Sequence, residues 1–239
     1  MNSQARMMTS TKHLLIGGGL ACSQAAKMLR MKESGSSITL TSKELHLPYD
    51  RPPLSKELLR GEKSIEQVIY DPPRFFEDKN IGVILGNPVV ALDTHVKTVE
   101  LAGGEVIQFE KAFIATGGDP LRLNIPGAKL AGVYYLRTME DARRIASEAG
   151  PGRRAVVIGA GFIGMEVAAS LTHAGVDVTV IETLPHIWPR FLDTTLAKYV
   201  QDHCETRGIR LCDRRQTPRA ARSRPRSLCA YRIGYANRV

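Results

Sequence analysis

The sequence predicts an α/β protein built from two similar units, each made of a strand, a glycine-rich turn and a helix. The apolar run at residues 13–16 is followed at once by Gly17, Gly18 and Gly19 and then by helix-like sequence. The same order recurs at residues 155–174, where the turn reads Gly-Ala-Gly-Phe-Ile-Gly. Because a glycine turn between a strand and a helix lets the backbone approach a pyrophosphate, both units are predicted to bind dinucleotides.

Length and composition fit one large domain or two modest ones. The chain has 239 residues, 43% of them hydrophobic, and a formal net charge of +9. Residues 213–239 hold eight arginines and one acidic residue, so the positive charge belongs to this tail and the rest of the chain is nearly neutral. This location argues against a nucleic-acid partner. No transmembrane segment and no secretory signal are expected, and a cytoplasmic location is the default.

The first unit is expected to span residues 12–124. After the glycine turn come a helix at residues 23–30 and a second strand at residues 38–41. Glu44 follows near the position from which an acidic residue reaches a ribose hydroxyl. The later expected elements are an extended segment at 64–70, a helix at 72–79, strands at 83–85 and 88–92, a hairpin at 96–109 and a buried strand at 113–118.

Residues 47–56 read Leu-Pro-Tyr-Asp-Arg-Pro-Pro-Leu-Ser-Lys and lie just after Glu44. Two consecutive prolines cannot sit inside a helix or a central strand, so a stiff extended segment is expected, followed by a short helix at residues 54–61. Such a segment would hold Arg51 and Lys56 at fixed points. A cofactor laid from the first glycine turn across the strand ends would meet these two side chains next.

The second unit is expected at residues 125–212, after a linker at residues 119–126 that contains Asp-Pro and Ile-Pro-Gly. Thr138 is a plausible N-cap for a helix at residues 139–148. Further elements are expected as a strand at 155–158, a helix at 165–174, a strand at 176–181, a helix at 193–207 and a strand that starts at 209–212.

Glu182 ends the second strand of this unit, at roughly the 20-residue spacing at which a carboxylate receives both ribose hydroxyls. An acidic residue there repels a 2′-phosphate, so NADH should be preferred over NADPH. The four cysteines include no Cys-x-x-Cys pair. They are therefore expected to be ordinary thiols of a reducing compartment, with no redox-active disulfide after the first helix.

Four segments together resemble the FAD-dependent, NADH-oxidising ferredoxin reductases: residues 17–22, 48–56, 115–118 and 159–166. The resemblance covers about residues 12–212. It implies two Rossmann-like dinucleotide-binding units of the pyridine nucleotide-disulfide oxidoreductase type, with FAD in the first and NADH in the second. The implied reaction is hydride transfer from the nicotinamide to the flavin, then electron delivery to a ferredoxin-like or rubredoxin-like acceptor protein.

The resemblance makes Lys56 and Glu166 the catalytic candidates. The Lys56 ammonium would stabilise negative charge on the reduced flavin ring, and Glu166 is expected to pair with it across the gap between the two units. For Arg51, Arg137 and Glu166 a solvated surface position remains the alternative. The cofactor-binding candidates are Gly17, Gly18, Gly19, Leu20, Ala21, Cys22, Glu44, Arg51, Lys56, Val90, Ala115, Thr116, Gly117, Arg137, Gly159, Gly161, Phe162, Ile163, Gly164 and Glu182.

The tail at residues 213–239 departs from the family pattern. It is arginine-rich and aperiodic, so it is predicted to be disordered, and a frameshift or truncated gene is favoured over a genuine basic segment. The family would continue with a Gly-Asp motif for the flavin ribityl chain and a C-terminal domain. The fold is therefore expected to be incomplete at the C-terminus and to retain FAD weakly. Two other interpretations stay open: an apoptosis-inducing-factor-like protein with a signalling or assembly role, and a non-functional fragment.

Overall fold

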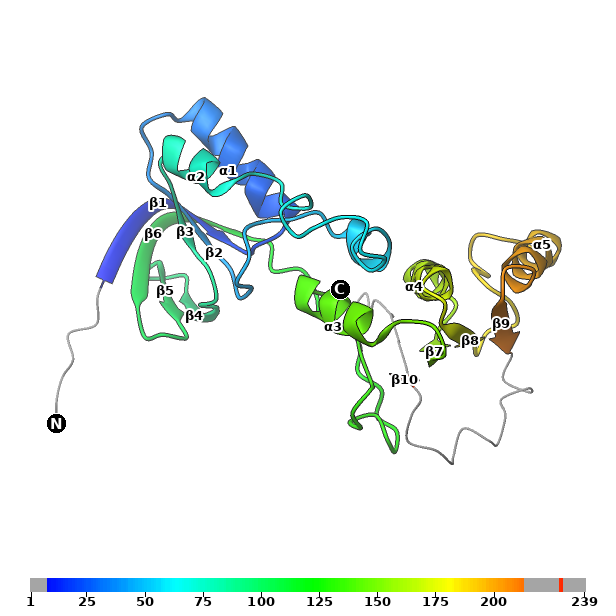
Figure 1. Ribbon diagram of the computed structural model, residues 1–239. Helices are drawn as coiled ribbons and strands as arrows, with labels where there is room; N and C mark the ends of the chain where they lie inside the picture. Colours follow the sequence, from blue (N-terminus) through cyan, green and yellow to red (C-terminus); the bar gives the residue numbers. More distant parts are fainter. Residues whose placement is uncertain (1–7, 213–227, 230–239) are drawn as a thin grey trace. The chain divides into compact units, whose positions relative to one another are not determined.

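The computed structural model describes residues 8–212 and 228–229 and contains two compact units (Figure 1). The first unit comprises residues up to Asp50 together with Val68–Gly117, and the second comprises Arg51–Gln67 together with residues from Gly118 onward. The proline-rich segment thus packs with the second unit. The functional division into an FAD-binding domain at 12–124 and an NAD-binding domain at 125–212 stays a prediction.

The first unit contains a six-stranded sheet with the order β3-β2-β1-β6-β5-β4. The strands β1, β2, β3 and β6 run parallel, whereas β5 runs antiparallel to both β4 and β6. The predicted α/β class is therefore confirmed. The elements of this unit are β1 (Met8–Ile16), α1 (Leu20–Lys32), β2 (Ile38–Thr41), α2 (Pro73–Asp78), β3 (Ile81–Ile84), β4 (Val89–Asp93), β5 (Thr98–Leu101) and β6 (Val106–Ile114).

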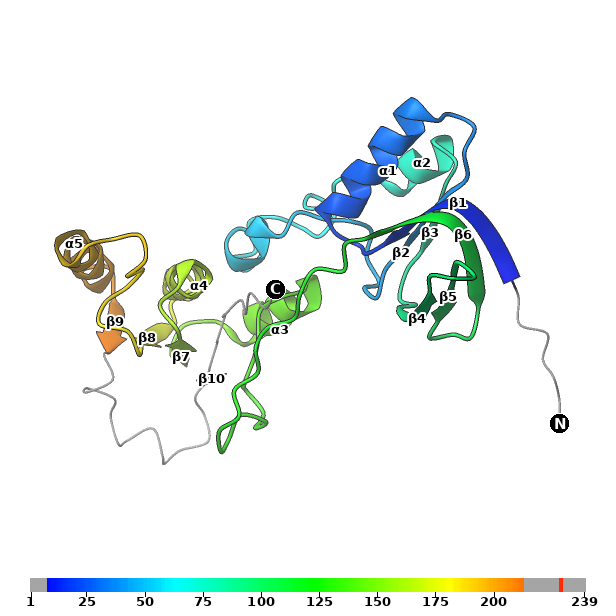
Figure 2. The same ribbon diagram turned by 180° about the vertical axis from the view of Figure 1, so that it is seen from behind.

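The central strand β1 is buried on both faces, which explains its unbroken apolar run. Leu15 packs into a cluster with α1 and α2 that includes Ala26 and Phe76. Leu14 and Ile16 point to the opposite face and pack against residues of β5 and β6. Figures 1 and 2 show α1 and α2 together on one face of the sheet. This alternation follows from the two-residue period of a strand and fixes where β1 delivers Gly17.

The strand β6 corrects two expectations. The second strand of the hairpin continues as one strand to Ile114, so the expected separate strand at 113–118 is wrong and residues 115–118 are not strand. β6 pairs with β5 only as far as Gln108 and with β1 from Val106 to Ile114. The predicted burial of residues 113–118 is wrong, since Phe113 is 44% exposed and Ile114 is 57% exposed. Beyond Gln108, β1 is the only strand that pairs with β6 in the described part of the chain.

The second unit contains a four-stranded parallel sheet with the order β10-β7-β8-β9. α4 contacts β7 and β8, and α5 contacts β9. Thr138 caps α3 in a full capping box with Asp141, as its position predicts. The elements are η1 (Pro52–Ser55), α3 (Met139–Glu148), β7 (Arg154–Ile158), α4 (Phe162–His173), β8 (Asp177–Ile181), α5 (Thr194–Glu205), β9 (Ile209–Cys212) and β10 (Leu228–Cys229).

The sequence predicts an extended proline-rich segment at residues 47–56, and this is wrong for Pro52–Ser55. Pro52 and Pro53 form the first turn of the short 3₁₀-helix η1. Proline suits this position because the first N–H groups of a helix need no internal partner and its fixed φ matches the helix. The expected helix at residues 54–61 is wrong beyond Ser55, where turns follow. The expected extended segment at 64–70 is also mostly turns, with one isolated bridge between Ile69 and Tyr49.

Most of the basic tail, and with it the predicted disorder of residues 213–239, lies outside the described residues. Within it, Leu228–Cys229 form β10, which pairs in parallel with β7 at Ala155 and Val156. Among residues 8–212 and 228–229, no helix combines the length and the apolar character needed to cross a membrane.

Candidate functional site

The first glycine turn lies between the carboxyl ends of β2 and β6, the two strands that flank β1. Gly17 has a φ of +141°, and a Cβ at this residue would lie 2.2 Å from the carbonyl oxygen of Ala115, just after β6. A Cβ on Gly18 would lie 2.1 Å from the hydroxyl of Ser42, just after β2. Side chains are therefore excluded on both sides, and the backbone itself lines the end of the sheet.

The helix α1 begins directly after this turn at an N-cap, Gly19, that has no side-chain hydrogen bond, and its first turn carries no acidic residue. Its first N–H groups are thus directed to the end of the sheet, which suits an anion. Leu20 is 50% exposed and Ala21 is exposed, whereas Cys22 is fully buried. Burial raises the pKa of the Cys22 thiol to about 11, so this residue contributes packing to the turn rather than a reactive thiolate.

Glu44 lies just beyond β2, where its backbone is fixed by Ser42 and Gly86. Its carboxylate accepts a hydrogen bond from the buried hydroxyl of Tyr49 at 2.5 Å. The sequence analysis missed this contact. Tyr49 follows Glu44 within the same segment, and this short spacing is the only signal that the sequence offers for the pair. The carboxylate is therefore held in place on one side by Tyr49.

The remaining candidates of the first unit lie in two different places. Ala115 donates its N–H to the carbonyl of Ile16 at 2.9 Å, so residues 115–117 leave the sheet beside the first glycine turn. Gly117 has a φ of +72°, which favours glycine. Val90 is 61% exposed on the edge strand β4, and β5 and β6 separate that strand from β1. A cofactor role for Val90 remains a prediction, and the position of β4 in the strand order does not place Val90 beside the first glycine turn.

The second glycine turn shows why its third glycine is needed. A Cβ on Gly164 would lie 2.0 Å from the carbonyl oxygen of Gly159, so α4 approaches the turn too closely for any side chain there. Gly159 has a φ of +102°. Gly161 is the N-cap of α4 without a side-chain cap, and the first turn of the helix has no acidic residue. This helix start can receive a phosphate in the same way as that of α1.

The carboxylate of Glu182 lies against this turn. It accepts the backbone N–H of Ala160 at 2.7 Å and those of Thr183 and Leu184 at 2.6 and 2.9 Å. Phe162, which is 50% exposed, stacks on Trp188 from the loop that follows Glu182. The structure thus brings the acidic residue and the glycine turn together, as their spacing in the sequence predicts.

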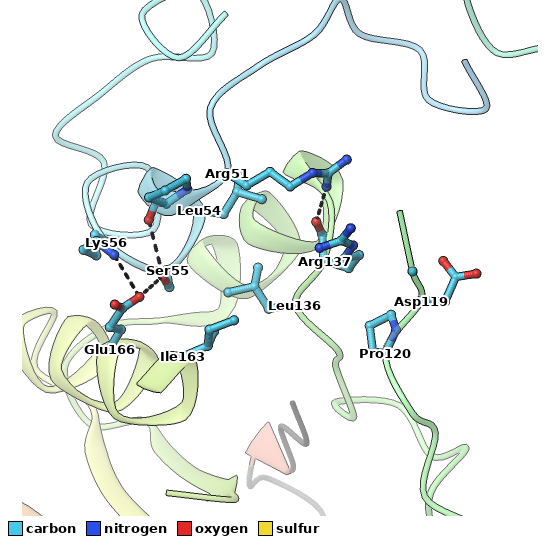
Figure 3. A pocket seen from close by; sticks show the side chains of 12 residues that line it. Arg51, Leu54, Ser55, Lys56, Asp119, Pro120, Leu136, Arg137, Ile163 and Glu166 are labelled. Atoms are coloured by element: carbon cyan, nitrogen blue, oxygen red, sulfur yellow. Dashed lines mark hydrogen bonds and ion pairs between the residues drawn. The ribbon is translucent and has the colours of Figure 1, made fainter. Parts of the chain in front are cut away.

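Lys56 and Glu166 form an ion pair in which the Lys56 Nζ lies 2.9 Å from the Glu166 Oε2 (Figure 3). The predicted pairing is confirmed. Its expected place across the gap between two units is wrong, because both residues belong to the second unit. The two side chains are 36% and 35% exposed, so solvent screens the pair and it contributes less than a fully buried one.

The pair lies on the wall of a cavity of about 300 Å³. Arg51 and Arg137 lie on the same wall, and the Arg51 guanidinium donates to the carbonyl of Arg137 at 2.6 Å. Ile163, from the first turn of α4, is part of the wall as well. The cavity therefore begins where α4 leaves the second glycine turn. Its complete lining is Arg51, Pro52, Leu54, Ser55, Lys56, Gly118, Asp119, Pro120, Leu136, Arg137, Ile163 and Glu166.

Several lining residues were not anticipated from the sequence, notably Ser55, Asp119 and Leu136. Ser55 donates its hydroxyl to Glu166 at 2.5 Å. Its position directly before Lys56 is the one hint in the sequence. Leu136 directly precedes Arg137 and is 5% exposed. The sequence alone does not distinguish it from an ordinary core leucine. The contacts that bring these residues to one wall join segments far apart in the chain.

The fold and these residues define an α/β protein with two glycine turns, each suited to a dinucleotide, and a cavity that carries charged groups. The family model of the pyridine nucleotide-disulphide oxidoreductases matches residues 11–225. The chain belongs to this family.

Curated relatives within the family are similar over most of this chain. Rhodocoxin reductase of Rhodococcus erythropolis is 38% identical over 198 residues, which are 83% of this chain and 46% of the relative. Rubredoxin-NAD(+) reductase of Pseudomonas putida is 36% identical over 82% of this chain and 51% of its own length. A crystal structure of NADH:rubredoxin oxidoreductase from Clostridium acetobutylicum superposes with a TM-score of 0.83 at 28% identity, covering 95% of this chain and 58% of that one. The chain spans about half the length of the curated relatives it matches.

Proposed function

We propose that this chain provides the FAD- and NADH-binding parts of an oxidoreductase that passes electrons from NADH through FAD to a ferredoxin-like or rubredoxin-like protein. The observation that carries the proposal is the course of α4. This helix starts in the second glycine turn, and its residues Ile163 and Glu166 line the cavity that holds Lys56. A nucleotide binding turn and a cavity with an ammonium group are thus joined by one helix.

The residues present fit the two cofactors. Gly17 and Gly18 leave the backbone bare at the end of the first sheet, and the start of α1 directs N–H groups there. Gly161 and Glu182 offer the matching combination of phosphate and ribose partners in the second unit. The printed names of the relatives support NAD as the nucleotide and rubredoxin or rhodocoxin as examples of the acceptor.

The chain's own residues have separate tasks in this proposal. Bound FAD would supply the redox chemistry that links a two-electron hydride donor to one-electron acceptors. The Lys56 ammonium stabilises negative charge that develops at the cavity wall, and Glu166 holds that ammonium in place. Glu182 accepts hydrogen bonds from the ribose hydroxyls and disfavours a 2′-phosphate. Arg51 and Arg137 add positive charge to the same wall.

Spectroscopy on the purified chain supplied with FAD tests the proposal. We expect anaerobic NADH to bleach the flavin absorbance, and an oxidised ferredoxin or rubredoxin to restore it. Replacing Lys56 by Met should slow the bleaching, whereas Lys198→Met, an exposed ion-paired lysine on α5, should not. A chain that binds both cofactors but shows no bleaching would favour a signalling or assembly role. A chain that binds neither would favour a non-functional fragment.

We also propose a cytoplasmic location. Cys22, Cys204 and Cys212 are free thiols in the structure, which suits a reducing compartment. Labelling of these thiols in denatured cell extracts prepared under acid trapping would check the proposal, since a protein from an oxidising compartment would show them blocked.

A further inference from the structure

Ser55 makes two hydrogen bonds to α4, one through its side chain and one through its backbone. It lies at the end of η1 and is 4% exposed. Its hydroxyl donates to the Glu166 Oε2 at 2.5 Å, as Figure 3 shows. Its carbonyl oxygen accepts the hydroxyl of Ser170 at 2.7 Å, and Ser170 is 2% exposed.

The two partners of Ser55 lie one helical turn apart. Glu166 and Ser170 occupy positions i and i+4 of α4, which places them on the same face of the helix. A single residue of η1 therefore holds two successive turns of α4. Two contacts spaced along the helix axis restrict sliding of α4 against η1 more than one contact would.

The side-chain contact of Ser55 reaches the same carboxylate oxygen that pairs with Lys56. The Glu166 Oε2 receives the Ser55 hydroxyl at 2.5 Å and the Lys56 ammonium at 2.9 Å. An ion pair that is about one third exposed on each side is weakly held by charge alone, and the lysine stem is flexible. The short, buried serine donor is the stiffer of the two partners. It sets the place of the carboxylate, and the carboxylate then sets the place of the ammonium.

We infer that Ser55 is a positioning residue for the Lys56–Glu166 pair. Its hydroxyl fixes Glu166 so that the Lys56 ammonium stays at the wall of the cavity. The consequence for electron transfer rests on the proposed function, but the positioning itself does not, since it concerns only these three side chains. In the described residues, Glu166 is the only charged group to which the Ser55 hydroxyl is hydrogen-bonded. The hydroxyl therefore acts on Lys56 through Glu166.

Lysine acylation of the full 239-residue chain tests the inference without any cofactor. Sulfo-N-hydroxysuccinimide acetate would be applied at neutral pH, and the rate at Lys56 would be read by peptide mass spectrometry. Lys198 serves as the internal reference, because it is paired with Asp202 at 2.8 Å without a serine donor. Ser55→Ala should raise the Lys56 rate about tenfold relative to Lys198, the lower end of the range expected for losing one hydrogen bond to a charged group.

Three further variants separate positioning from general loosening. Ser55→Thr retains the hydroxyl and should restore the wild-type rate. Ser170→Ala removes the hydroxyl that donates to the Ser55 carbonyl and accepts from Arg60 at 3.4 Å, and it keeps the contact between Ser55 and Glu166. It should therefore lower thermal stability while leaving the Lys56 rate unchanged. In a Glu166→Ala background, where the Lys56 rate is already high, Ser55→Ala should add nothing, because the serine has lost the group through which it acts.

The inference would be overturned if Ser55→Ala raised the acylation rate of Lys56 equally in the presence and absence of Glu166. It would also be overturned if Ser55→Ala raised the acylation rates of Lys56 and Lys198 alike. If Ser55→Ala or Ser55→Thr does not fold, the ratio of the Lys56 acylation rate to the Lys198 acylation rate in Ser170→Ala and Glu166→Ala still tests the inference. A change of this ratio in Ser170→Ala would contradict the inference. The proposed function is judged separately, by flavin reduction in the FAD-supplied chain. There Ser55→Ala should lower the maximal reduction rate without weakening NADH binding. A change in acylation with no change in reduction rate would uphold the positioning role and count against the proposed function.

Discussion

The carboxylate of Glu182 accepts the backbone N–H of Ala160 at 2.7 Å, which brings the end of β8 against the second glycine turn. Ala160 is itself 1% exposed, so the contact is anchored in the core of the unit. A nucleotide whose phosphates occupy the start of α4 would find this carboxylate beside its ribose. The relationship explains why one acidic side chain should decide which nucleotide is preferred.

Glu182→Ala should weaken NADH binding roughly tenfold, because two hydroxyls of the ribose lose their acceptor. The same change should reduce the preference for NADH over NADPH, since the repulsion of a 2′-phosphate disappears. Isothermal titration of the purified chain with each nucleotide measures both effects. Asp177→Ala, which removes a carboxylate from the opposite end of β8 and keeps Glu182, is the control. Equal or tighter binding of NADPH by the wild-type chain would contradict the assignment of Glu182.

Gly164→Ala should destabilise the second unit by about 1–3 kcal/mol, because the added Cβ overlaps the carbonyl of Gly159 and must push α4 away. Gly161→Ala is a matched control on the same helix start. A Cβ on Gly161 meets nothing within 4 Å, and its φ of −71° suits any residue. Urea denaturation of the two variants compares them directly. Similar losses of stability in both would show that close helix packing is not the reason for the third glycine.

Cys22 should resist alkylation at neutral pH in the folded chain. Its side chain is fully buried, and burial raises the pKa of the thiol to about 11, so both access and thiolate are lacking. Peptide-level mass spectrometry after brief iodoacetamide treatment would follow each cysteine, with Cys212 as a partly exposed comparison. Cys22 should react only after denaturant is added. Labelling of Cys22 as fast as Cys212 in the native chain would refute the expectation.

Acid should destabilise the first unit partly through Glu33. Hydrogen bonds from Lys12 at 2.7 Å and from His13 at 3.1 Å lower the pKa of this carboxyl to about 2. A carboxyl whose pKa is lower in the folded state stabilises the fold above its unfolded pKa of 4.5, and this contribution is lost as the pH falls toward 2. Glu33→Gln should therefore show a flatter decline of stability between these pH values.

Chemical denaturation at a series of pH values, with the wild-type chain as reference, measures this slope. Lys12→Met removes the largest cause of the lowered pKa while leaving the carboxyl in place, so it should flatten the same part of the curve. A pH profile for Glu33→Gln that runs parallel to that of the wild type would rule out the linkage.

Local chemistry alone determined many elements of this protein. Thr138 as an N-cap predicts the start of α3. The glycine turns predict the helices α1 and α4, although these begin at Leu20 and Phe162, about three residues before the expected starts at 23 and 165. These features depend on neighbours within one helical turn, so they are legible in the sequence. The pairing of Lys56 with Glu166 was also predicted, but from a family resemblance rather than from local rules.

Tertiary structure decided the rest, because it depends on contacts between distant segments. Pro52 and Pro53 are compatible with both an extended segment and a first helical turn, and packing against the second unit selects the turn. The course of β6 as one strand follows from its long pairing with β1, which no local pattern encodes. Ser55 reaches α4 across more than a hundred residues of sequence. Sequence thus specifies which groups are available for the site, whereas packing specifies which of them meet.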